Sequence, residues 1–450
     1  MSESTHGDEA LAPRCRSLWD AVEGRIADGI RRHRCEDLEL RVVDAAGWPV
    51  PASLLRLRLR RHSFRFGANL FLVGHFAEAQ QGARWAALFG ADRAVHPGAL
   101  FNAGTLPFYW RDLVPQEGHD RFSADAPAMH RRPPADAAVA FGLERELDLN
   151  GHCLAWDAPE LSLPDWLPVE PGRRSAAMGS FIQELARRYG NHVRRWDVLN
   201  EPVRRWSNGR FAEVPMPPDY EAFAFSCAQA SLPTDAVLMI NEGGDTGGPW
   251  RRPFAEKYRG VIRDLRRRGA RIATVGLQFH QFDLGGFAAG TAELDPVAVW
   301  DELDRYAELG LPLHISEVTM AQPQTGAAGE YIQAELTRRF YRLFHAHPAV
   351  QAITWWNCVD GTAWQQENHV LSGLLDADCR PKPVHAALDG LINREWAPVV
   401  DTQTDGSGCW RGRLPAGVWD VTVEAGRLRG GASATLAAGG GTVIVRLTDA

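Results

Sequence analysis

Two glutamates that lie far apart in the chain, Glu201 and Glu317, occupy the same kind of position. Each follows a short apolar run, residues 196–199 and residues 311–315, that favours a buried strand. Pro202 cannot continue a sheet ladder and disfavours helix before it, so Glu201 is expected at the carboxyl end of its strand. Two such groups can cleave a glycosidic bond with retention. One protonates the leaving oxygen, and the other attacks the anomeric carbon from about 5 to 5.5 Å away.

Other polar and aromatic residues also follow expected strands. Asn200 could hydrogen-bond a sugar 2-hydroxyl, and His280 could hold the Glu317 carboxylate in its charged form. A histidine taken singly is more often a satisfied core residue, but convergence on one face favours a binding site, and aromatic rings suit the apolar faces of a sugar. We therefore expect Glu201 and Glu317 to be catalytic. The expected substrate-binding residues are Asn200, His152, Trp156, Gln278, His280, Trp356, Trp364, Asn102 and Tyr109.

The middle of the chain alternates short apolar segments with helical ones, the pattern of a parallel sheet. Strands are expected at residues 65–68, 100–103, 149–155, 195–199, 236–240, 274–278, 312–315 and 352–356. Because no G-x-G-x-x-G follows the first of these segments, a closed (β/α)8 barrel is favoured over an open dinucleotide-binding sheet. Active sites of such barrels lie at the carboxyl ends of the strands, where both glutamates are expected.

The two ends of the chain differ from the middle. We divide the chain into an N-terminal helical extension (1–35), a β-strand pair (36–64), the barrel (65–396) and a C-terminal β region (397–450). Two strands alone are marginal in water, so the pair is expected to pack with the C-terminal strands into a small β-sandwich, or into two adjoining β pieces. Structural support is the plainer role. The alternative is a carbohydrate-binding module, because Trp410 and Trp419 could stack on sugars.

Composition excludes several other classes. The chain has 450 residues, 45% of them hydrophobic, and a net charge of -7. Its basic runs, at residues 56–61 and 263–268, alternate with apolar residues and indicate solvated faces, so a nucleic-acid partner is not expected. Seven cysteines without a C-x-x-C indicate neither a disulfide framework nor a zinc site. The start lacks the pattern of a signal peptide, and no run reaches membrane-spanning length, so no membrane partner is expected. A cytoplasmic protein is the plain expectation, although a secreted mature form would leave the same trace; the sequence does not indicate an oligomeric state.

The run Trp196-Asp197-Val198-Leu199-Asn200-Glu201 resembles the acid/base motif of glycoside hydrolase family 10, whose best-known members are endo-β-1,4-xylanases. His314-Ile315-Ser316-Glu317 resembles the nucleophile strand of that family. Further matches follow in order: Phe66-Gly67-Ala68, Phe101-Asn102, Gly151-His152, Gly276-Leu277-Gln278-Phe279-His280, Ile353-Thr354-Trp355-Trp356 and Pro381-Lys382-Pro383. An isolated Asn-Glu-Pro is common among barrel glycosidases, whereas this ordered set is not. The resemblance implies a (β/α)8 barrel with Glu201 as acid/base, Glu317 as nucleophile, a β-linked polysaccharide or oligosaccharide as substrate, and no metal or organic cofactor.

The chain departs from the family pattern on the non-reducing side of the cleft. Residues 105–110 read Thr-Leu-Pro-Phe-Tyr-Trp where the family carries Glu-Asn and a lysine; Asp157 replaces a second histidine, and residues 241–244 replace Asn-Asp-Tyr. Loss of a charged donor to a buried hydroxyl costs about 1.5 to 3 kcal/mol. We therefore expect a xylan-like or other plant-type β-glycoside, held against an apolar wall of Phe108, Tyr109 and Trp110. The alternatives are another sugar specificity on the same barrel and a non-catalytic carbohydrate-binding barrel.

Overall fold

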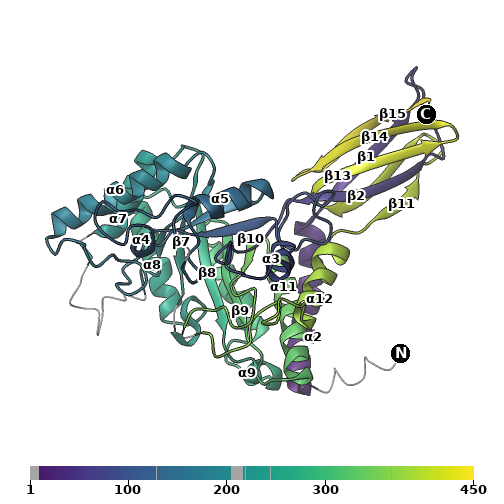
Figure 1. The fold of residues 1–450 in the computed structure, drawn as a ribbon. Coiled ribbons are helices and arrows are strands. Elements are labelled where there is room, and N and C mark those ends of the chain that lie inside the picture. The colour runs from purple at the N-terminus through teal and green to yellow at the C-terminus, as the bar shows by residue number, and fades with distance from the viewer. Residues whose placement is uncertain are drawn as a thin grey trace.

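The structure, a computed structural model, describes residues 10–127, 129–203, 216–217, 219–243, 245–365 and 367–449. Its centre is a closed barrel in the order β10-β3-β4-β5-β6-β7-β8-β9, with all neighbouring strands parallel (Figure 1). The strands are β3 (Arg65–Asn69), β4 (Ala103–Pro107), β5 (Asp148–Ala155), β6 (Arg195–Asn200), β7 (Val237–Glu242), β8 (Thr274–Gln281), β9 (Leu313–Met320) and β10 (Val350–Trp355). The predicted (β/α)8 barrel is confirmed.

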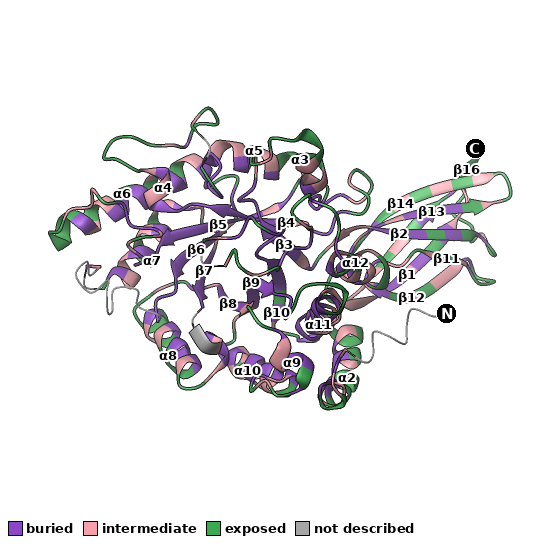
Figure 2. Ribbon diagram, turned by 60° about the horizontal axis from the view of Figure 1, so that its bottom comes forward, coloured by how far each residue is buried: buried purple, intermediate pink, exposed green. Residues whose placement is uncertain are grey.

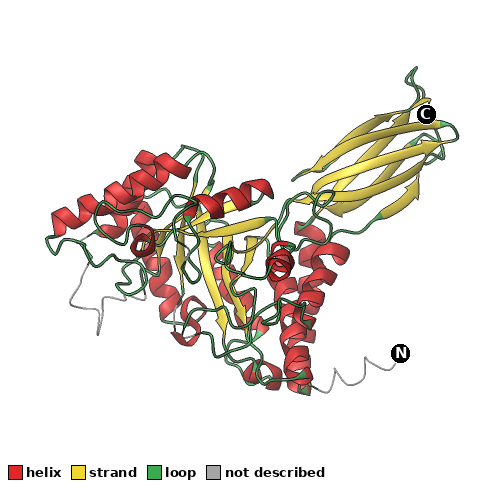
Figure 3. Ribbon diagram, viewed as in Figure 1, coloured by secondary structure: helices red, strands yellow, loops and turns green. Residues whose placement is uncertain are grey.

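Helices surround the barrel, and the strands inside this ring are buried (Figures 2 and 3). They are α3 (Ala79–Ala86), α4 (Trp110–Leu113), α5 (Ala135–Glu144), α6 (Pro171–Tyr189), α7 (Tyr220–Ser231), η2 (Asp245–Trp250), α8 (Phe254–Arg267), α9 (Gly285–Ala289), α10 (Pro296–Ala307), α11 (Ala327–Ala346), α12 (Pro383–Asp389) and η3 (Gly390–Glu395). Local chemistry sets several of their starts. In α6 the Glu170 side chain accepts hydrogen bonds from the first-turn backbone N–H groups, and Pro171 fills the first position.

Strand β4 begins later than the sequence predicted, because the Asn102 side chain hydrogen-bonds the backbone of Phe64 and Phe66. Asn102 Oδ1 accepts a 2.9 Å hydrogen bond from the Phe66 N–H, and its Nδ2 donates to Phe64 O over 2.9 Å. Pro107, which has no N–H to donate, is the last residue of the strand. Asn102 therefore lies before the amino end of its strand, whereas the glutamates lie at carboxyl ends.

Both ends of the chain build the predicted β-sandwich, which has a hydrophobic core of its own. One sheet has the order β12-β1-β15 and the other the order β11-β2-β13-β14-β16, with β1 and β15 parallel. The strands are β1 (Cys35–Val43), β2 (Leu54–His62), β11 (Val400–Gln403), β12 (Cys409–Pro415), β13 (Gly417–Ala425), β14 (Leu428–Leu436), β15 (Gly441–Arg446) and β16 (Thr448–Asp449). Trp419 is fully buried in this core and Trp410 packs against it, so stacking of a sugar on Trp419 is excluded.

The sandwich is joined to the barrel through the end of β2. Arg60 and Arg61 both contact Asp92, at 2.7 and 3.2 Å, and these hydrogen bonds, that of Arg60 foremost, lower the pKa of Asp92 to about 2. His62 Nε2 lies 2.9 Å from Ile392 O. The residue pairs come from both sides of the junction, so the sandwich and the barrel share a polar seam.

The N-terminal helix α2 (Pro13–His33) lies along α11 on the outside of the barrel (Figure 1). Its buried residues recur at helical spacing, and Trp19 meets Phe340 edge to face, with ring centroids 4.9 Å apart. Gly29 allows the close approach, because a Cβ there would lie 2.5 Å from the backbone oxygen of Ala346. Within the described part of the chain, no helix is long and apolar enough to cross a membrane.

Two glycines of α2 give a matched test of this packing. Gly29→Ala should lower the free energy of unfolding by about 1 to 3 kcal/mol, because the new methyl group is overpacked against Ala346. Gly24→Ala should raise it by up to about 1 kcal/mol, because Gly24 has nothing within 4 Å of an added Cβ and alanine favours helix. Thermal and urea unfolding measure both. Equal effects of the two substitutions would contradict the docking of α2.

Candidate active site

A cavity of about 990 Å³ opens where the barrel strands end. Every expected site residue except Asn102 lines it: Glu201, Glu317, Asn200, His152, Trp156, Gln278, His280, Trp356, Trp364 and Tyr109. Asn102 holds backbone at the other end of its strand, so the expectation that it binds substrate is wrong. Closure of the barrel thus gathers side chains from distant parts of the chain into one site.

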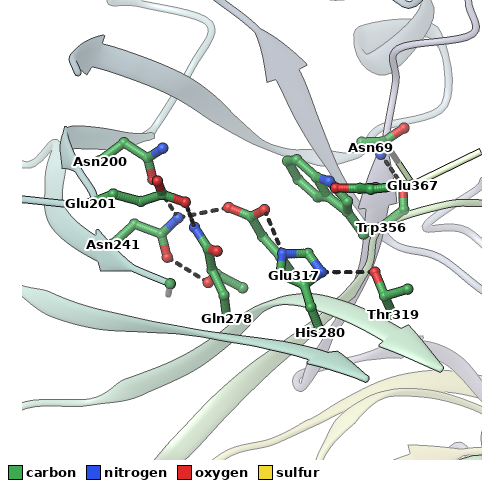
Figure 4. Close-up of polar contacts among 12 residues, drawn as sticks. Asn69, Asn200, Glu201, Asn241, Gln278, His280, Glu317, Thr319, Trp356 and Glu367 are labelled. Atoms are coloured by element: carbon green, nitrogen blue, oxygen red, sulfur yellow. Dashed lines mark hydrogen bonds and ion pairs between the residues drawn. The ribbon is translucent and has the colours of Figure 1, made fainter. Parts of the chain in front are cut away.

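Glu317 is held by both of its carboxylate oxygens (Figure 4). Asn241 Nδ2 donates to Oε1 over 2.8 Å, and His280 Nε2 lies 3.3 Å from Oε2. His280 Nδ1 in turn contacts Thr319 Oγ1 at 2.8 Å, and Ser316 Oγ donates to Asn241 Oδ1. Glu317 is therefore buried with its orientation fixed.

Glu201 leaves its strand by a sharp backbone turn. Its N–H still donates to Asn241 O over 2.8 Å, as in a ladder, but its φ is +50°, in the left-handed region that side chains disfavour. Such a conformation costs on the order of 1 to 3 kcal/mol and persists only where the surroundings hold it. Gln278 Nε2 donates to Glu201 Oε1 over 3.1 Å, and Glu242 accepts the N–H of Val203 just beyond.

A register shift between β8 and β9 brings the two halves of the site together. Leu277 pairs with Ile315, but the next residue, Gln278, pairs with Glu317, so Ser316 is an extra residue in β9. A bulge of this kind re-aims a side chain next to a functional site. It places Glu317 opposite Gln278, the residue that also contacts Glu201.

His152 faces the cavity with one ring nitrogen engaged. Its Nδ1 lies 2.9 Å from Asp197 Oδ2, the same oxygen that accepts a 2.9 Å hydrogen bond from Asn150 Nδ2. Burial alone would lower the pKa of His152, but the bond to Asp197 and the negative charge of Glu317 outweigh it and raise the pKa. Asp197 thus fixes the ring and leaves Nε2 for a ligand.

The apolar wall differs from the prediction. Tyr109 lines the cavity, but Phe108 stacks on Tyr189 at 5.1 Å and Trp110 stacks on Phe181 at 5.1 Å, so both belong to the barrel core. The wall of Phe108, Tyr109 and Trp110 is therefore wrong for two of its three members. The missing hydrophobic surface is supplied by Phe71, whose ring meets Trp356 at 5.1 Å.

Three residues of the site were not among those expected from the sequence. Asn241 is the next-to-last residue of β7 and pairs with Asn200, the last residue of β6, so its position near a strand end was a usable signal. Arg131 and Arg132 lie in the loop after α4, and nothing in their sequence context indicated that they would reach the cavity. Burial lowers the pKa of Arg131 to about 10, which keeps it charged at neutral pH.

Nothing in the described residues groups three or more histidine, cysteine or acidic side chains as a metal ion would need. The chemistry available to this arrangement is that of two oriented carboxyl groups, amide donors and aromatic surface. Burial would lower the pKa of His280, but its hydrogen bond to Glu317 and the charge of that carboxylate raise it. The site therefore places a histidine with a raised pKa beside Glu317.

Comparison with known proteins gives a consistent result. The family model for glycosyl hydrolase family 10 matches residues 125–390. Endo-1,4-beta-xylanase B of Thermotoga neapolitana is 27% identical over 274 residues, which cover 58% of this chain and 74% of that protein. Anti-sigma-I factor RsgI6 of Acetivibrio thermocellus is 22% identical over 397 residues, covering 88% of this chain and 45% of that protein. Native xylanase 10B of Thermotoga maritima has the same fold, with a TM-score of 0.58 and 21% identity over 74% of this chain and 96% of its own.

The contact between Glu317 and His280 predicts a measurable coupling. In Glu317→Gln the pKa of His280 should fall, because burial still lowers it while the opposing charge is gone. The raised pKa of His280 in the wild-type protein contributes to the free energy of unfolding. This contribution is fully present below about pH 6.5 and is lost as the pH rises through the raised value. NMR titration of the histidine rings measures the change. His314, whose pKa burial holds well below its usual range, is the internal control and should not move.

Proposed function

The chain belongs to glycosyl hydrolase family 10, and from this premise we propose that it cleaves a xylan-like or other plant-type β-glycoside with retention of configuration. The observation that carries the proposal is the pair of buried glutamates at one barrel mouth, joined through Asn241 and Gln278. Retaining glycosidases use two such carboxyl groups and need no metal for the reaction.

In the first step Glu317 attacks the anomeric carbon and forms a covalent glycosyl-enzyme, while Glu201 protonates the departing oxygen. The bond from Asn241 and the contact with His280 keep the Glu317 carboxylate pointed into the cavity. Asn200 Oδ1 already accepts a 2.9 Å hydrogen bond from Asn241, so its NH2 group is the part that would meet the sugar 2-hydroxyl.

In the second step Glu201, now a carboxylate, takes a proton from water, and the water oxygen attacks the same carbon and releases Glu317. Two inversions at one carbon give overall retention. His152, Trp156 and Trp356 would hold the sugar meanwhile: the tryptophans offer apolar surface to its C–H faces, and the ring nitrogen of His152 serves a hydroxyl.

The cavity wall differs from the family pattern where it would meet the sugar. The family match begins at residue 125, after β3 and β4, which is the segment where the sequence departs from the family pattern. Tyr109 stands on the cavity wall in that segment, with the Arg132 guanidinium 3.8 Å above its ring. This altered wall supports a substrate other than plain xylan.

A second candidate is a barrel that binds carbohydrate without cleaving it. The alignment that covers 88% of the chain is with a protein named as an anti-sigma factor, which favours a regulatory role for a related chain. The contacts around Glu317 and Glu201 favour catalysis. Calorimetry with plant-wall oligosaccharides decides between them, since binding without release of product from any β-glycoside would support the second candidate.

Removal of either carboxyl group should abolish turnover of natural substrates. Glu317→Ala and Glu201→Ala should each lower kcat/KM by about 10⁴-fold, the scale of losses seen when an essential nucleophile or acid/base is removed. A 2-fluoro activated glycoside should label Glu317 in the wild-type protein, as mass spectrometry of its peptides would show. Thermal unfolding is the control for folding. Labelling elsewhere, or activity that survives both substitutions, would refute the roles.

The acid role of Glu201 predicts a dependence on the leaving group. A leaving group that departs as a stable anion needs no proton, so Glu201→Ala should still form the glycosyl-enzyme from 2,4-dinitrophenyl glycosides while losing alkyl glycosides. Glu317→Ala should lose both. Pre-steady-state release of dinitrophenol measures the first step. Equal loss of both substrate classes in Glu201→Ala would show that Glu201 is not the acid.

A further inference from the structure

The loop between α4 and α5 reaches across the cavity to the loop that follows β10. Arg131 Nη1 donates to Thr362 O over 2.9 Å and to Asn357 Oδ1 over 3.1 Å. Beside it, His130 Nε2 lies 3.4 Å from Ala363 O. Two segments more than 200 residues apart in the chain are thus joined at the rim of the site.

Arg131 makes this bridge at a cost. It is 2% exposed, its φ is +57°, and no acidic side chain in the described ranges forms an ion pair with it. A buried charge is unfavourable unless it is well hydrogen-bonded, and a non-glycine residue is strained in the left-handed region. The bonds to the second loop, with the Phe71 ring 5.1 Å away, are what hold it there.

Arg132 extends the bridge into a wall. Its Nε donates to Asp112 Oδ2 over 2.6 Å, its guanidinium lies 3.8 Å above the Tyr109 ring, and it is 5.1 Å from the ring of Trp364. The rings of Tyr109 and Trp364 both line the cavity. The cation therefore lies close to two aromatic rings, that of Tyr109 just before α4 and that of Trp364 in the loop that follows β10.

A chain of side-chain contacts connects the nucleophile to this wall. His280 contacts Glu317, the Trp356 ring lies 6.3 Å from His280, and the Phe71 ring lies 5.1 Å from Trp356. Arg131 and Arg132 follow, 5.1 and 5.6 Å from the Phe71 ring. Glu317 attacks the glycone, and this chain of contacts does not include Glu201, which protonates the leaving group, so we place the wall on the glycone side of the cleavage point.

We propose that the Arg131–Arg132 step closes the non-reducing end of the cavity, so that the enzyme removes a mono- or disaccharide from the chain end instead of cutting inside a polymer. The inference rests on the proposed retaining hydrolysis and adds the position of the cut. An internal cut needs the glycone chain to pass where Arg131 joins the two loops. Gly247, Phe287 and Leu294 also line the cavity, and we assign the remainder of the substrate to them.

The test uses β-1,4-linked hexaoses of xylose, glucose and mannose, each carrying ¹⁸O at the reducing end. Mass spectrometry of early products from the full-length protein reports which side of each cut carries the label. Unlabelled mono- or disaccharide should exceed unlabelled tri- and tetrasaccharide by at least about tenfold. Predominant cuts with three or more sugars on the unlabelled side would overturn the inference and leave retaining hydrolysis intact, whereas no cut in any hexaose or aryl β-glycoside would overturn the proposed function.

Variants separate the wall from general effects of mutation. Arg131→Gly removes the bridge and relieves the left-handed backbone, and Arg132→Ala removes the side wall without touching Thr362. At least one should raise the share of unlabelled products of three or more sugars by about tenfold. Glu117→Gln, an exposed change in the same loop, is the matched control and should keep the wild-type pattern. Unchanged products from both folded arginine variants, as checked by thermal unfolding, would overturn the inference.

Discussion

One amide group, that of Asn241, ties the parts of the site together. Its Nδ2 donates to Glu317 and to Asn200, the neighbour of Glu201, and its Oδ1 accepts from Ser316. The amide can take this position because the facing residue of β8 is Gly276, where a Cβ would lie 2.5 Å from Asn241 Oδ1. The orientation of the Glu317 carboxyl group thus depends on one side chain and on the absence of another, while Gln278 holds Glu201. The barrel strands fix the backbone of the site, and the Asn241 amide orients the side chains that it contacts.

Burial gives these contacts their weight. Glu201 and Glu317 are each 5% exposed, and a carboxylate removed from water must be hydrogen-bonded to stay charged. The Asn241 amide and His280 meet that need at Glu317, and no arginine or lysine among the described residues forms an ion pair with it. A full ion pair would hold the carboxylate more tightly and weaken it as a nucleophile. The bonds present leave its charge available for a developing positive centre, which is the electrostatic help that a sugar cation requires.

The barrel and the residues at the carboxyl ends of its strands could be predicted because strand and helix periodicities are local signals. Once the barrel closes, the residues at these strand ends must lie at one rim. That is why Glu317 and Gln278 were placed together from sequence alone. The start of β4 was predicted at residue 100 but lies at Ala103, and only tertiary hydrogen bonds show that Asn102 holds backbone. Phe108 was assigned to the wall because its aromatic type does not say which face of the chain turns inward. Arg131 lies in a loop, where periodicity carries no information.

Strands and loops have different roles in the site because their backbones are held to different extents. Groups that must keep their angles sit on barrel strands, where each backbone position is fixed by two neighbours, as at the shift that sets Glu317 opposite Gln278. The limits of the cavity are set by loops, and a loop is only as rigid as its contacts. Arg131 meets this condition by bonding to a backbone carbonyl, an acceptor that remains whatever side chain Thr362 carries. A loop anchored in this way can determine the shape of the cavity, while the strands determine the positions of the two carboxyl groups.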